Sequence, residues 1–369
     1  MDNNNKCGFI DKTGQVVIPC QWEGAAGFSE GLAPVQDANE KWGFIDKTGK
    51  VVIPCKWESA DKFHEGLARV KDFNYKYGFI DKTGQVVIPC EWNWAEEFHE
   101  GLAKVMDDND KWGFIDKTGQ VVSPCQWIEA GDFSEGLAAV RDFYDKYGYI
   151  DKTGKVVIPC QWKRAGWFNE GLARVQAAND KWGFIDKTGK VVIHCKWEGA
   201  GDDFHDGLAA VQDANGKWGF IDKTGKIVSP CQWKNLYDFS DGLAAVQDAN
   251  GKWGFINKTG QVVISCQWKD AFKFHEGLVA VQAANDKYGF IDKIGRLVIP
   301  CQWKFTVIFH EGLAVVRDAN GKEGFIDKTG QVVIPCQWES ADEFHEGLAK
   351  VRDANWRYGY IDKTGKVVK

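Results

Sequence analysis

The feature that most constrains this chain is a phrase that returns every 35 residues. The phrase is Trp/Tyr-Gly-Phe-Ile-Asp-Lys-Thr-Gly, and its first glycine falls at Gly8, Gly43, Gly78, Gly113, Gly148, Gly183, Gly219, Gly254, Gly289, Gly324 and Gly359. One step is 36 residues long, because Asp202 and Asp203 carry an extra residue before Phe204. A unit this short cannot bury a core alone, so neighbouring units must stack. We therefore predict a single array over residues 1–369, made of ten repeats and a C-terminal partial repeat, with no separate domain.

Within one repeat, apolar stretches are separated by two turn signals. Residues 67–71 and 77–80 flank residues 72–76, where other copies carry Asp-Ala-Asn-Gly, and Asn-Gly between apolar runs is a strong hairpin signal. Residues 81–84, Asp-Lys-Thr-Gly, form a second turn with glycine at the left-handed position. Residues 86–88 then form another strand. Each repeat is thus predicted to be a three-stranded antiparallel meander.

The rest of the repeat indicates how the strands end and how they are covered. Pro89 is expected to end the third strand, and residues 95–98 are expected to form a short turn of helix. Residues 42–45 alternate Trp and Phe with Gly and Ile, so both faces of the sheet are apolar there and neighbouring units must cover them. Residues 68–71 alternate Ala and Val with Arg and Lys, which predicts a first strand at an exposed edge.

The two ends of the array bear on its architecture. The chain begins with second and third strands, in residues 7–19, and ends with a complete meander, in residues 348–368. No first strand is therefore left to complete the N-terminal hairpin, and ten blades would exceed the four to eight usual in propellers. We expect an all-β fold in which the meanders stack as an open superhelical solenoid, with a closed β-propeller as the alternative.

Ten of the eleven cysteines occupy one slot, in Cys-x-Trp: Cys20, Cys55, Cys90, Cys125, Cys160, Cys195, Cys231, Cys266, Cys301 and Cys336. Each could pair only with its copy in the next unit, and α-carbons farther apart than ~7 Å cannot be bridged. We expect free thiols that act as small hydrophobes, which suits a reducing compartment. Residues 1–6 show no signal-peptide pattern, and no run of about eighteen apolar residues occurs, so we expect a cytoplasmic protein that does not enter the membrane.

The repeats offer little of the asymmetry that a catalytic site needs. No Gly-x-Ser-x-Gly, phosphate loop, His-Glu-x-x-His or Cys-x-x-Cys motif occurs, so we expect neither an enzyme nor a cofactor. Six of the seven histidines share the slot Phe-His-Glu/Asp-Gly: His64, His99, His205, His275, His310 and His345. With Cys55 and Glu65, His64 offers at most three of the four ligands of structural zinc, so we interpret this slot as a surface position. The turn lysines form a row, but Asp precedes ten of them, so we expect no nucleic-acid partner.

The core Trp-Gly-Phe-Ile-Asp, with Lys before the Trp in most copies, resembles the WG repeat family of bacterial β-repeats. The resemblance extends from Lys6 to Val368 and implies the β-repeat, but no particular activity, cofactor or partner. The departures are local: Cys7 and Glu323 replace the aromatic residue, Asn257 replaces Asp, Ile294 replaces Thr, and His194 and Ser265 replace Pro. A lone buried carboxylate would be costly, so Glu323 predicts that the aromatic position is not fully buried everywhere.

The copies differ mainly in two places. The first is the segment after Cys-x-Trp, and the second is the middle of the first strand: Pro34, Arg69, Lys104, Ala139, Arg174, Ala210, Ala245, Ala280, Val315 and Lys350. A solenoid presents the same slot of every unit along one surface, and large residues in such slots are of the types enriched at interface hot spots. The candidate partner-binding residues are Trp94, Arg164, Trp167, Tyr237, Phe272 and Phe305. The alternatives are drift at tolerant surface positions and packing between units.

The function that these features favour is a non-catalytic scaffold that binds another protein through the variable face. One alternative is a glycan- or cell-wall-binding module that uses the repeated tryptophans of Cys-x-Trp, from Trp22 to Trp338. Another is a structural element that self-associates through its open ends, where the N-terminal hairpin and Cys7 lie.

Overall fold

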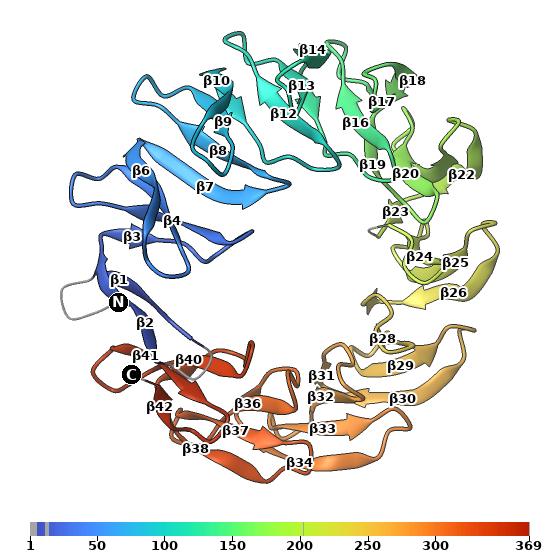
Figure 1. The fold of residues 1–369 in the computed structure, drawn as a ribbon. Coiled ribbons are helices and arrows are strands. Elements are labelled where there is room, and N and C mark those ends of the chain that lie inside the picture. Colours follow the sequence, from blue (N-terminus) through green and yellow to red (C-terminus); the bar gives the residue numbers. More distant parts are fainter. Residues whose placement is uncertain (1–5, 12–14, 202, 369) are drawn as a thin grey trace. The chain divides into compact units, whose positions relative to one another are not determined.

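The computed structural model describes residues 6–11, 15–201 and 203–368. It comprises two compact units: the first holds residues up to 11 and Val16–Cys195, and the second holds Gln15 and the chain from Lys196 onward. Within each unit, small antiparallel sheets follow one another in chain order (Figure 1), which confirms the all-β fold of repeated meanders. The choice between an open superhelix and a propeller depends on how the units join, and stays a prediction. In the described ranges there is no helix long and apolar enough to cross a membrane.

The repeated sheet holds four strands, which we name in chain order the variable, first, second and third strands. The variable strands are β3 (Gly24–Ala25), β7 (Ser59–His64), β11 (Trp94–Ala95), β15 (Glu129–Ala130), β19 (Arg164–Asn169), β23 (Gly199–Ala200), β27 (Asn235–Leu236), β31 (Asp270–Ala271), β35 (Phe305–Thr306) and β39 (Ser340–Ala341). The first strands are β4 (Leu32–Gln36), β8 (Leu67–Lys71), β12 (Leu102–Met106), β16 (Leu137–Arg141), β20 (Leu172–Gln176), β24 (Leu208–Gln212), β28 (Leu243–Gln247), β32 (Leu278–Gln282), β36 (Leu313–Arg317) and β40 (Leu348–Arg352).

The second strands are β5 (Trp42–Asp46), β9 (Tyr77–Ile80), β13 (Trp112–Asp116), β17 (Tyr147–Asp151), β21 (Trp182–Asp186), β25 (Trp218–Asp222), β29 (Trp253–Asn257), β33 (Tyr288–Asp292), β37 (Glu323–Asp327) and β41 (Tyr358–Asp362). The third strands are β6 (Val51–Trp57), β10 (Val86–Trp92), β14 (Val121–Trp127), β18 (Val156–Trp162), β22 (Val191–Trp197), β26 (Ile227–Trp233), β30 (Val262–Trp268), β34 (Leu297–Trp303), β38 (Val332–Trp338) and β42 (Val367–Val368). At the N-terminus, β1 (Cys7–Ile10) pairs with β2 (Val16–Trp22) alone.

The variable strand takes the place of the expected helical turn. In the sheet of β11, the backbone N–H of Asn93 donates to the carbonyl of Met106, and that of Glu96 donates to Lys104. The first strand has one edge that the second strand does not use, and this edge pairs with the incoming chain. The helix prediction for residues 95–98 is therefore wrong, and the three-stranded meander gains a fourth strand.

The third strand continues through its proline instead of ending there. β10 runs from Val86 to Trp92 and includes Pro89, with register shifts on both sides of Ile88. This strand lies at the edge of its sheet, where a residue without an N–H removes no ladder bond. The sequence prediction that Pro89 ends the strand is therefore wrong.

The first strand is an inner strand, whereas the third strand forms an exposed edge. β8 lies between β7 and β9, which corrects the prediction of a first strand at an exposed edge, and Ala68 and Val70 are buried between neighbouring sheets. By contrast, Val51 and Val52 at the start of β6 are 43 % and 39 % exposed. Neighbouring sheets thus cover the middle of each sheet on both faces but leave the start of the third strand in solvent.

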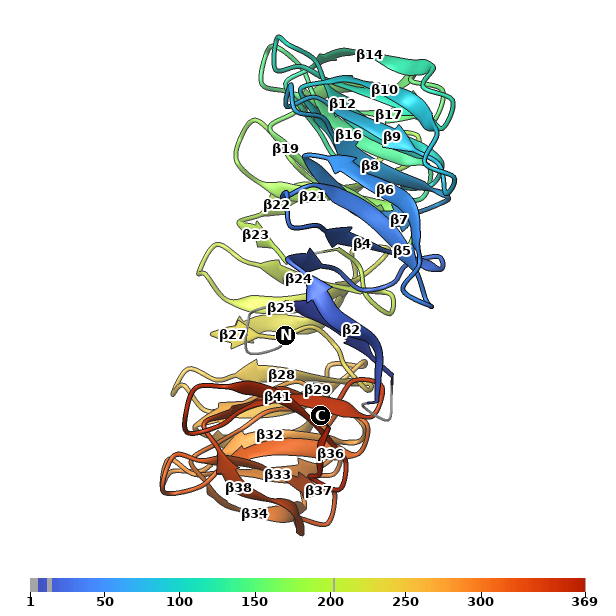
Figure 2. The same ribbon diagram turned by 60° about the vertical axis from the view of Figure 1, so that its left-hand side comes forward.

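Consecutive sheets meet at what we call the sheet joint, formed by the third-strand isoleucine and the glycine of the next sheet's Asp-Lys-Thr-Gly turn. A Cβ at Gly84 would lie 3.0 Å from Ile53 of the preceding sheet, so the joint leaves room for little more than hydrogen. Nearby, the rings of Phe44 and Phe63 from the same two sheets lie 4.9 Å apart. Each buried cluster therefore draws on two sheets, which Figure 2 shows stacked face to face within the first unit.

Two joints carry serine instead of isoleucine, and there the turn comes closer. At Ser123 the turn of the next sheet lies very close to the third strand. A Cβ on Gly154 in this turn would lie 2.3 Å from the carbonyl oxygen of Val122. The Ser123 hydroxyl also accepts a hydrogen bond of 3.1 Å from the indole of Trp127. The smaller side chain thus exchanges apolar packing for backbone contact and a buried hydrogen bond.

Polar ties at the rim reinforce each joint. The Glu30 carboxylate accepts the backbone N–H of Gly66 at 3.1 Å and lies 3.0 Å from the ammonium of Lys82, both in the next sheet. In the adjacent slot, His64 Nδ1 lies 2.6 Å from the carbonyl oxygen of Phe98, again in the following sheet. Stacking within a unit is therefore held by the apolar joint and by hydrogen bonds around it.

Candidate functional site

The six candidate residues lie on or beside the variable strands, where the structure separates them by exposure. Four expose more than a third of their surface: Trp94 (39 %), Arg164, Trp167 (58 %) and Tyr237 (41 %). The other two, Phe272 and Phe305, are half-buried. The candidate slots therefore do not form one uniformly exposed face.

Trp94 and Phe305 fill the same slot, two residues after the Trp of Cys-x-Trp, and both pack against the preceding sheet. The Trp94 ring lies 5.1 Å from the ring of Tyr77, and the Arg69 guanidinium lies 5.3 Å from the same Trp94 ring. The Phe305 ring lies 6.5 Å from that of Tyr288. Both residues contribute to packing between sheets, and Trp94 keeps part of its surface in solvent.

Tyr237 and Phe272 fill a second slot, two residues further along, and each approaches the second-strand ring of its own sheet. Tyr237 stacks on Trp253 with ring centroids 5.0 Å apart and planes inclined by 6°. Phe272 lies 6.0 Å from Tyr288 in the equivalent position. The first strand of the Tyr237 sheet carries Ala245, whose short side chain leaves room for the ring.

Other sheets place a cation from the first strand at this position. Lys104 Nζ lies 5.2 Å from the centroid of the Trp112 ring. It also lies 2.8 Å from Glu96, which fills the Tyr237 slot, and 3.3 Å from Asp132 of the next sheet. The two variable columns are therefore coupled in several units: Arg69, Lys104 and Lys350 each occur with an acid, whereas Ala245 and Ala280 each occur with a ring. This exchange explains part of the variation without any ligand.

The first-strand column does not face outward, which corrects the sequence interpretation. Its small members are buried: Ala139, Ala210, Ala245, Ala280 and Val315. The reason is the extra variable strand, which makes the first strand an inner one. The long basic members Arg69 and Lys104 are largely buried as well, and each pairs with an acid and lies over an aromatic ring.

Trp167 is the most exposed of the candidate aromatic residues. It lies on β19, and its indole nitrogen lies 3.4 Å from the position that a Cβ of Gly131 would occupy in the preceding sheet. The preceding sheet has only Gly131 and Ala139 there, so the indole edge rests on a small-residue surface while most of the ring stays in solvent. Arg164 is exposed on the same strand.

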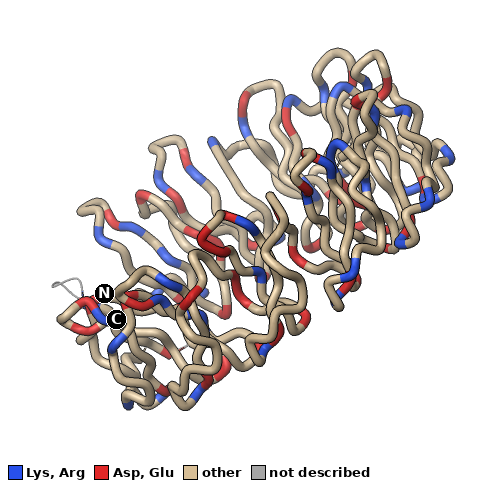
Figure 3. The backbone as a smooth tube through the Cα atoms, turned by 90° about the horizontal axis from the view of Figure 1, so that it is seen from above, with Lys and Arg blue, Asp and Glu red and all other residues tan. Residues whose placement is uncertain are grey.

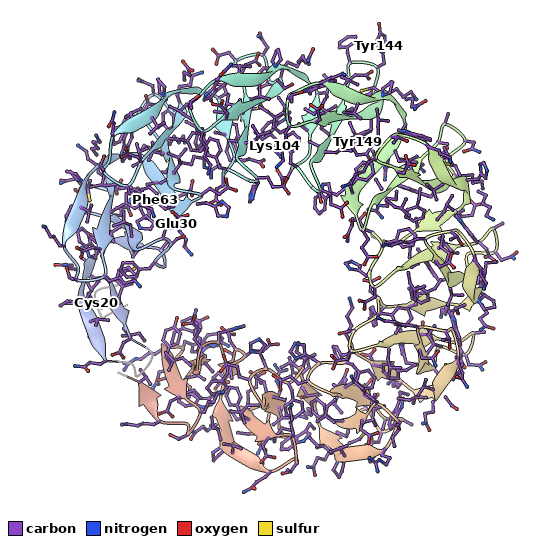
Figure 4. All side chains as sticks on the ribbon, turned by 45° about the vertical axis from the view of Figure 1, so that its right-hand side comes forward. Cys20, Glu30, Phe63, Lys104, Tyr144 and Tyr149 are labelled. Atoms are coloured by element: carbon purple, nitrogen blue, oxygen red, sulfur yellow. The ribbon has the colours of Figure 1, made fainter. Side chains whose placement is uncertain are left out.

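A second group of exposed aromatic residues, which the sequence interpretation missed, lies in the turn between first and second strands. We call this turn the hairpin tip, and its exposed aromatics are Phe73, Tyr75, Phe143, Tyr144 and Trp356. Phe143 and Tyr144 are each 80 % exposed, and Figure 4 shows Tyr144 projecting from its tip. The signal was present in the sequence, because other copies have Asp-Ala-Asn-Gly at the same positions.

Ten segments of the chain match the family described as WG containing repeat: residues 8–42, 42–77, 77–112, 112–142, 147–182, 182–218, 218–253, 253–288, 288–322 and 324–355. The chain belongs to the WG repeat family. No curated protein matches the chain as a relative.

Solved structures similar to this WG repeat protein share little sequence with it. The computationally designed Ika8 protein is 13 % identical, with 72 % of this chain and 94 % of that chain covered and a TM-score of 0.37. BamB from Moraxella catarrhalis is 12 % identical, with coverages of 69 % and 87 % and a TM-score of 0.34. Sqt1 from Saccharomyces cerevisiae is 12 % identical, with coverages of 72 % and 91 % and a TM-score of 0.33.

The cysteines of the WG units lie partly buried beside the backbone of their own sheet. The thiol of Cys125 lies 3.9 Å from the carbonyl oxygen of Val105, and its copies make the same contact in other units. Burial, together with the nearby Asp107 carboxylate, raises the pKa of Cys125 to about 11. The thiolate is the nucleophilic form, so such a thiol is a poor nucleophile at neutral pH.

The histidine slot of the WG units ties one sheet to the next. His275 and His310 repeat the bond made by His64, each placing Nδ1 2.6 Å from a phenylalanine carbonyl oxygen of the following sheet. Ser29 and Ser134 occupy the same slot, and their hydroxyls donate to the equivalent carbonyl oxygens of Phe63 and Phe168 in the following sheets. Over the part of the chain that the structure describes, no group of three or more His, Cys, Asp or Glu residues is placed to hold a metal ion.

Eight turn lysines of the WG units pair with acids of the preceding sheet. The pairs are Lys82–Glu30, Lys117–Glu65, Lys152–Glu100, Lys187–Glu135, Lys258–Asp206, Lys293–Asp241, Lys328–Glu276 and Lys363–Glu311. Lys and Arg are accordingly interspersed with Asp and Glu along the backbone (Figure 3). These lysines act as ties between sheets in addition to lying at the rim.

Glu323 stands where most WG units carry Trp or Tyr. This position is half-buried in most units and 63 % exposed at Tyr358, which confirms that it is not fully buried everywhere, but Glu323 itself is buried. Its side chain is only 5 % exposed. The Arg317 guanidinium donates to it at 2.6 and 3.0 Å, and the backbone N–H of Ala341 donates at 2.6 Å. These charge-assisted hydrogen bonds replace the lost water, so the buried carboxylate is not a lone one.

Proposed function

We propose that this WG repeat protein is a non-catalytic cytoplasmic scaffold that binds another protein through exposed side chains that differ from copy to copy. The observation that carries the proposal is the location of the exposed aromatic residues. Repeated aromatics such as Phe44 and Trp57 are buried, whereas Trp167, Phe143 and Tyr144 project at slots that vary between copies. Aromatic side chains are enriched at interface hot spots, and exposed apolar groups on a soluble surface favour interaction.

Neither of two other binding roles gains the same support. A glycan-binding module would need the repeated indoles of Cys-x-Trp at the surface, yet these indoles are buried or half-buried throughout the described residues. A nucleic-acid partner would need unpaired basic side chains, whereas the turn lysines pair with acids. The scaffold proposal therefore rests on side chains that distinguish one unit from another.

The test compares capture of proteins from a native lysate by the natural chain and by a variant with reset aromatics. The variant carries Trp94→Ser, Trp167→Lys, Phe143→Ala and Tyr144→Asn, which are residues that other copies hold in these slots. We expect a protein that the natural chain captures to be lost from the variant, with the circular dichroism spectrum unchanged.

A matched control removes apolar surface that every copy shares. Val51→Thr and Val156→Thr alter side chains that are 43 % and 41 % exposed, close to the exposure of Trp94, on edge strands with the same sequence in most units. Capture by this control is expected to equal that of the natural chain. Equal capture by all three chains would show that the variable aromatics do not bind the partner, and the scaffold proposal would then fail.

A further inference from the structure

One sheet of the second unit lacks the cover that its neighbours place against the second-strand ring. In the sheet of β23 to β26, the coupled variable slots hold Ala210 and Gly201, so neither a cation nor a ring is available. The space beside the Trp218 indole is a cavity of about 260 Å³, bounded by these two small residues and by residues 235–238 of the next sheet. Ligand pockets for drug-sized molecules have volumes of about 300–1,000 Å³, so this cavity suits a smaller group.

The sheet that carries Lys104 shows what fills the equivalent space elsewhere. The Lys104 ammonium lies 5.2 Å from the ring centroid of Trp112, the second-strand aromatic. The same ammonium lies 3.3 Å from Asp132, which belongs to the variable segment of the next sheet. A cation, an aromatic ring, an acid of the same sheet (Glu96, at 2.8 Å) and an acid of the following sheet thus form one arrangement.

The cavity retains two of these four parts, the ring and the acid of the following sheet. Trp218 is the second-strand aromatic of its sheet, and Asp238 occupies the slot of Asp132 in the next sheet. The first-strand cation and the acid of the same sheet are missing, because Ala210 and Gly201 stand in their slots. Asp238 lies 3.5 Å from Lys273, but both side chains are more than a third exposed, and exposed pairs of this kind contribute little. Its carboxylate can therefore exchange partners at small cost.

We propose that this cavity binds a lysine or arginine side chain of a partner protein, supplied from outside at the place where other sheets supply their own. The proposal rests on the scaffold function above and adds the chemistry of the partner, a segment with an accessible basic side chain. A cation close to a tryptophan face is attracted by the ring quadrupole, and a nearby carboxylate adds charge complementarity. In three further sheets, a first-strand cation of the same sheet lies over the second-strand ring: Arg69, Arg174 and Lys350.

The test follows the indole N–H signal of Trp218 by nuclear magnetic resonance in the full chain, with the signal assigned by its loss in Trp218→Phe. The probes are the blocked tripeptides acetyl-Gly-Lys-Gly-amide and acetyl-Gly-Arg-Gly-amide, with norleucine in place of the basic residue as the neutral probe. We expect a saturable shift with both basic peptides and none with the norleucine peptide.

Three variants separate the cavity from the rest of the surface. Ala210→Lys supplies the cation within the chain, as Lys104 does, and is expected to abolish the saturable shift while the chain stays folded. Asp238→Asn removes the acid and is expected to weaken binding by about fivefold or more, from the loss of a charge pair worth roughly 1 kcal/mol. Asp132→Asn alters the acid that Lys104 already engages, and binding is expected to be unchanged.

The outcomes that overturn the proposal are distinct from failure of the scaffold function. No shift, an equal shift with norleucine, or undiminished binding by Ala210→Lys would show that the cavity is not a cation site, whatever the chain captures through its exposed aromatics. Methylguanidinium serves as a further probe for a site that binds small cations. If it binds as tightly as the peptides, and if Ala210→Lys leaves capture of the partner unchanged, the assignment to a partner side chain is overturned.

Discussion

The two turns of each unit both need a residue with positive φ, yet they treat that position differently. In the turn at residues 81–84 the position is Gly84, with φ of +85°, and every copy of the turn has glycine there. At the hairpin tip of residues 72–76 the position is Tyr75, with φ of +64°, and other copies hold Glu, Asp, Gly or Trp. Both positions thus require a positive φ, but only the hairpin tip accepts residues other than glycine.

The difference lies in the room beyond the backbone. A Cβ at Gly84 would lie 3.0 Å from the buried Ile53 of the preceding sheet. At the hairpin tip, a Cβ on Gly251 would meet only the far end of Gln247, at 3.8 Å. Left-handed strain alone is therefore tolerated at an exposed tip, whereas strain together with a steric clash in the sheet joint is not. The joint keeps the units alike, and the tip allows them to differ.

The largest effect is expected where backbone meets backbone at a joint. In Gly260→Ala the new Cβ would lie 2.3 Å from the carbonyl oxygen of Val228, at a φ of +80°. Left-handed strain and overpacking together are expected to lower the free energy of unfolding by about 4 kcal/mol. Gly251→Ala, at a tip of the same unit, is expected to lower it by only about 1 kcal/mol. Urea unfolding followed by circular dichroism measures both, and equal losses would contradict the comparison.

A smaller effect is expected from filling a serine joint. Ser229→Ile inserts a branched side chain where the Gly260 turn already contacts the backbone, and it removes the hydroxyl that accepts the Trp233 indole N–H at 3.0 Å. Overpacking and the lost hydrogen bond are expected to lower the free energy of unfolding by about 3 kcal/mol. Ser229→Ala loses the hydrogen bond alone and should lower it by about 1 kcal/mol. If the isoleucine variant were as stable as the alanine variant, the serine joints would not be tighter than the others.

Relief of strain at a tip is expected to raise stability. Tyr75→Gly removes a bulky residue from the left-handed region at the cost of its contact with the Lys71 ammonium, 4.7 Å from the ring centroid. The net gain in the free energy of unfolding is expected to be about 0.5–1 kcal/mol. Tyr75→Asn serves as the control, because asparagine tolerates this conformation while keeping a side chain. A lower melting temperature in Tyr75→Gly would indicate that the tyrosine is held there by packing.

The smallest effect is expected from the rim ties, which depend on pH. The hydrogen bond from Lys82, supported by the N–H of Gly66 and opposed by burial, lowers the pKa of Glu30. A lowered folded-state pKa means that the contribution to stability is present above the unfolded value of about 4.3 and is lost as pH falls through the folded value. Glu30→Gln is therefore expected to cost about 0.5 kcal/mol at pH 7, and the cost is expected to shrink as the pH is lowered below the unfolded value. A cost that did not fall at all with decreasing pH would show that the tie is not ionic.

Much of the fold could be predicted because its signals are local. The period, the two turns and the three main strands follow from glycine, Asp-Lys-Thr-Gly and the apolar runs of a single copy, as residues 67–88 show. The variable strand could not be predicted in this way. In β11 only Trp94 and Ala95 pair with the first strand, and a pairing this short depends on a free strand edge that only the folded sheet provides.

The candidate site was predicted only in part. The sequence shows which slots vary between copies, but it does not show which residues contact one another across strands and sheets. Trp167 stands out as a large residue in a variable slot, and it is exposed. The exchange of Lys104 and Glu96 for Ala245 and Tyr237 involves residues eight positions apart, one on the first strand and one directly after the variable strand, which one copy read alone does not reveal. The turn-lysine partners lie 52 residues away, so the bonds between sheets depend on how the units stack.

The ties between sheets have a mechanical consequence. They connect residues 34 to 52 positions apart, as from His64 to Phe98 and from Glu65 to Lys117, so each sheet grips the one that follows it in the chain. When a unit is pulled from its two ends, its sheets would therefore unfold one after another. Each unfolding event would extend one repeat of 35 residues. At 3.3–3.6 Å per extended residue, each step would lengthen the chain by roughly 120 Å. A force–extension curve would then show evenly spaced unfolding events.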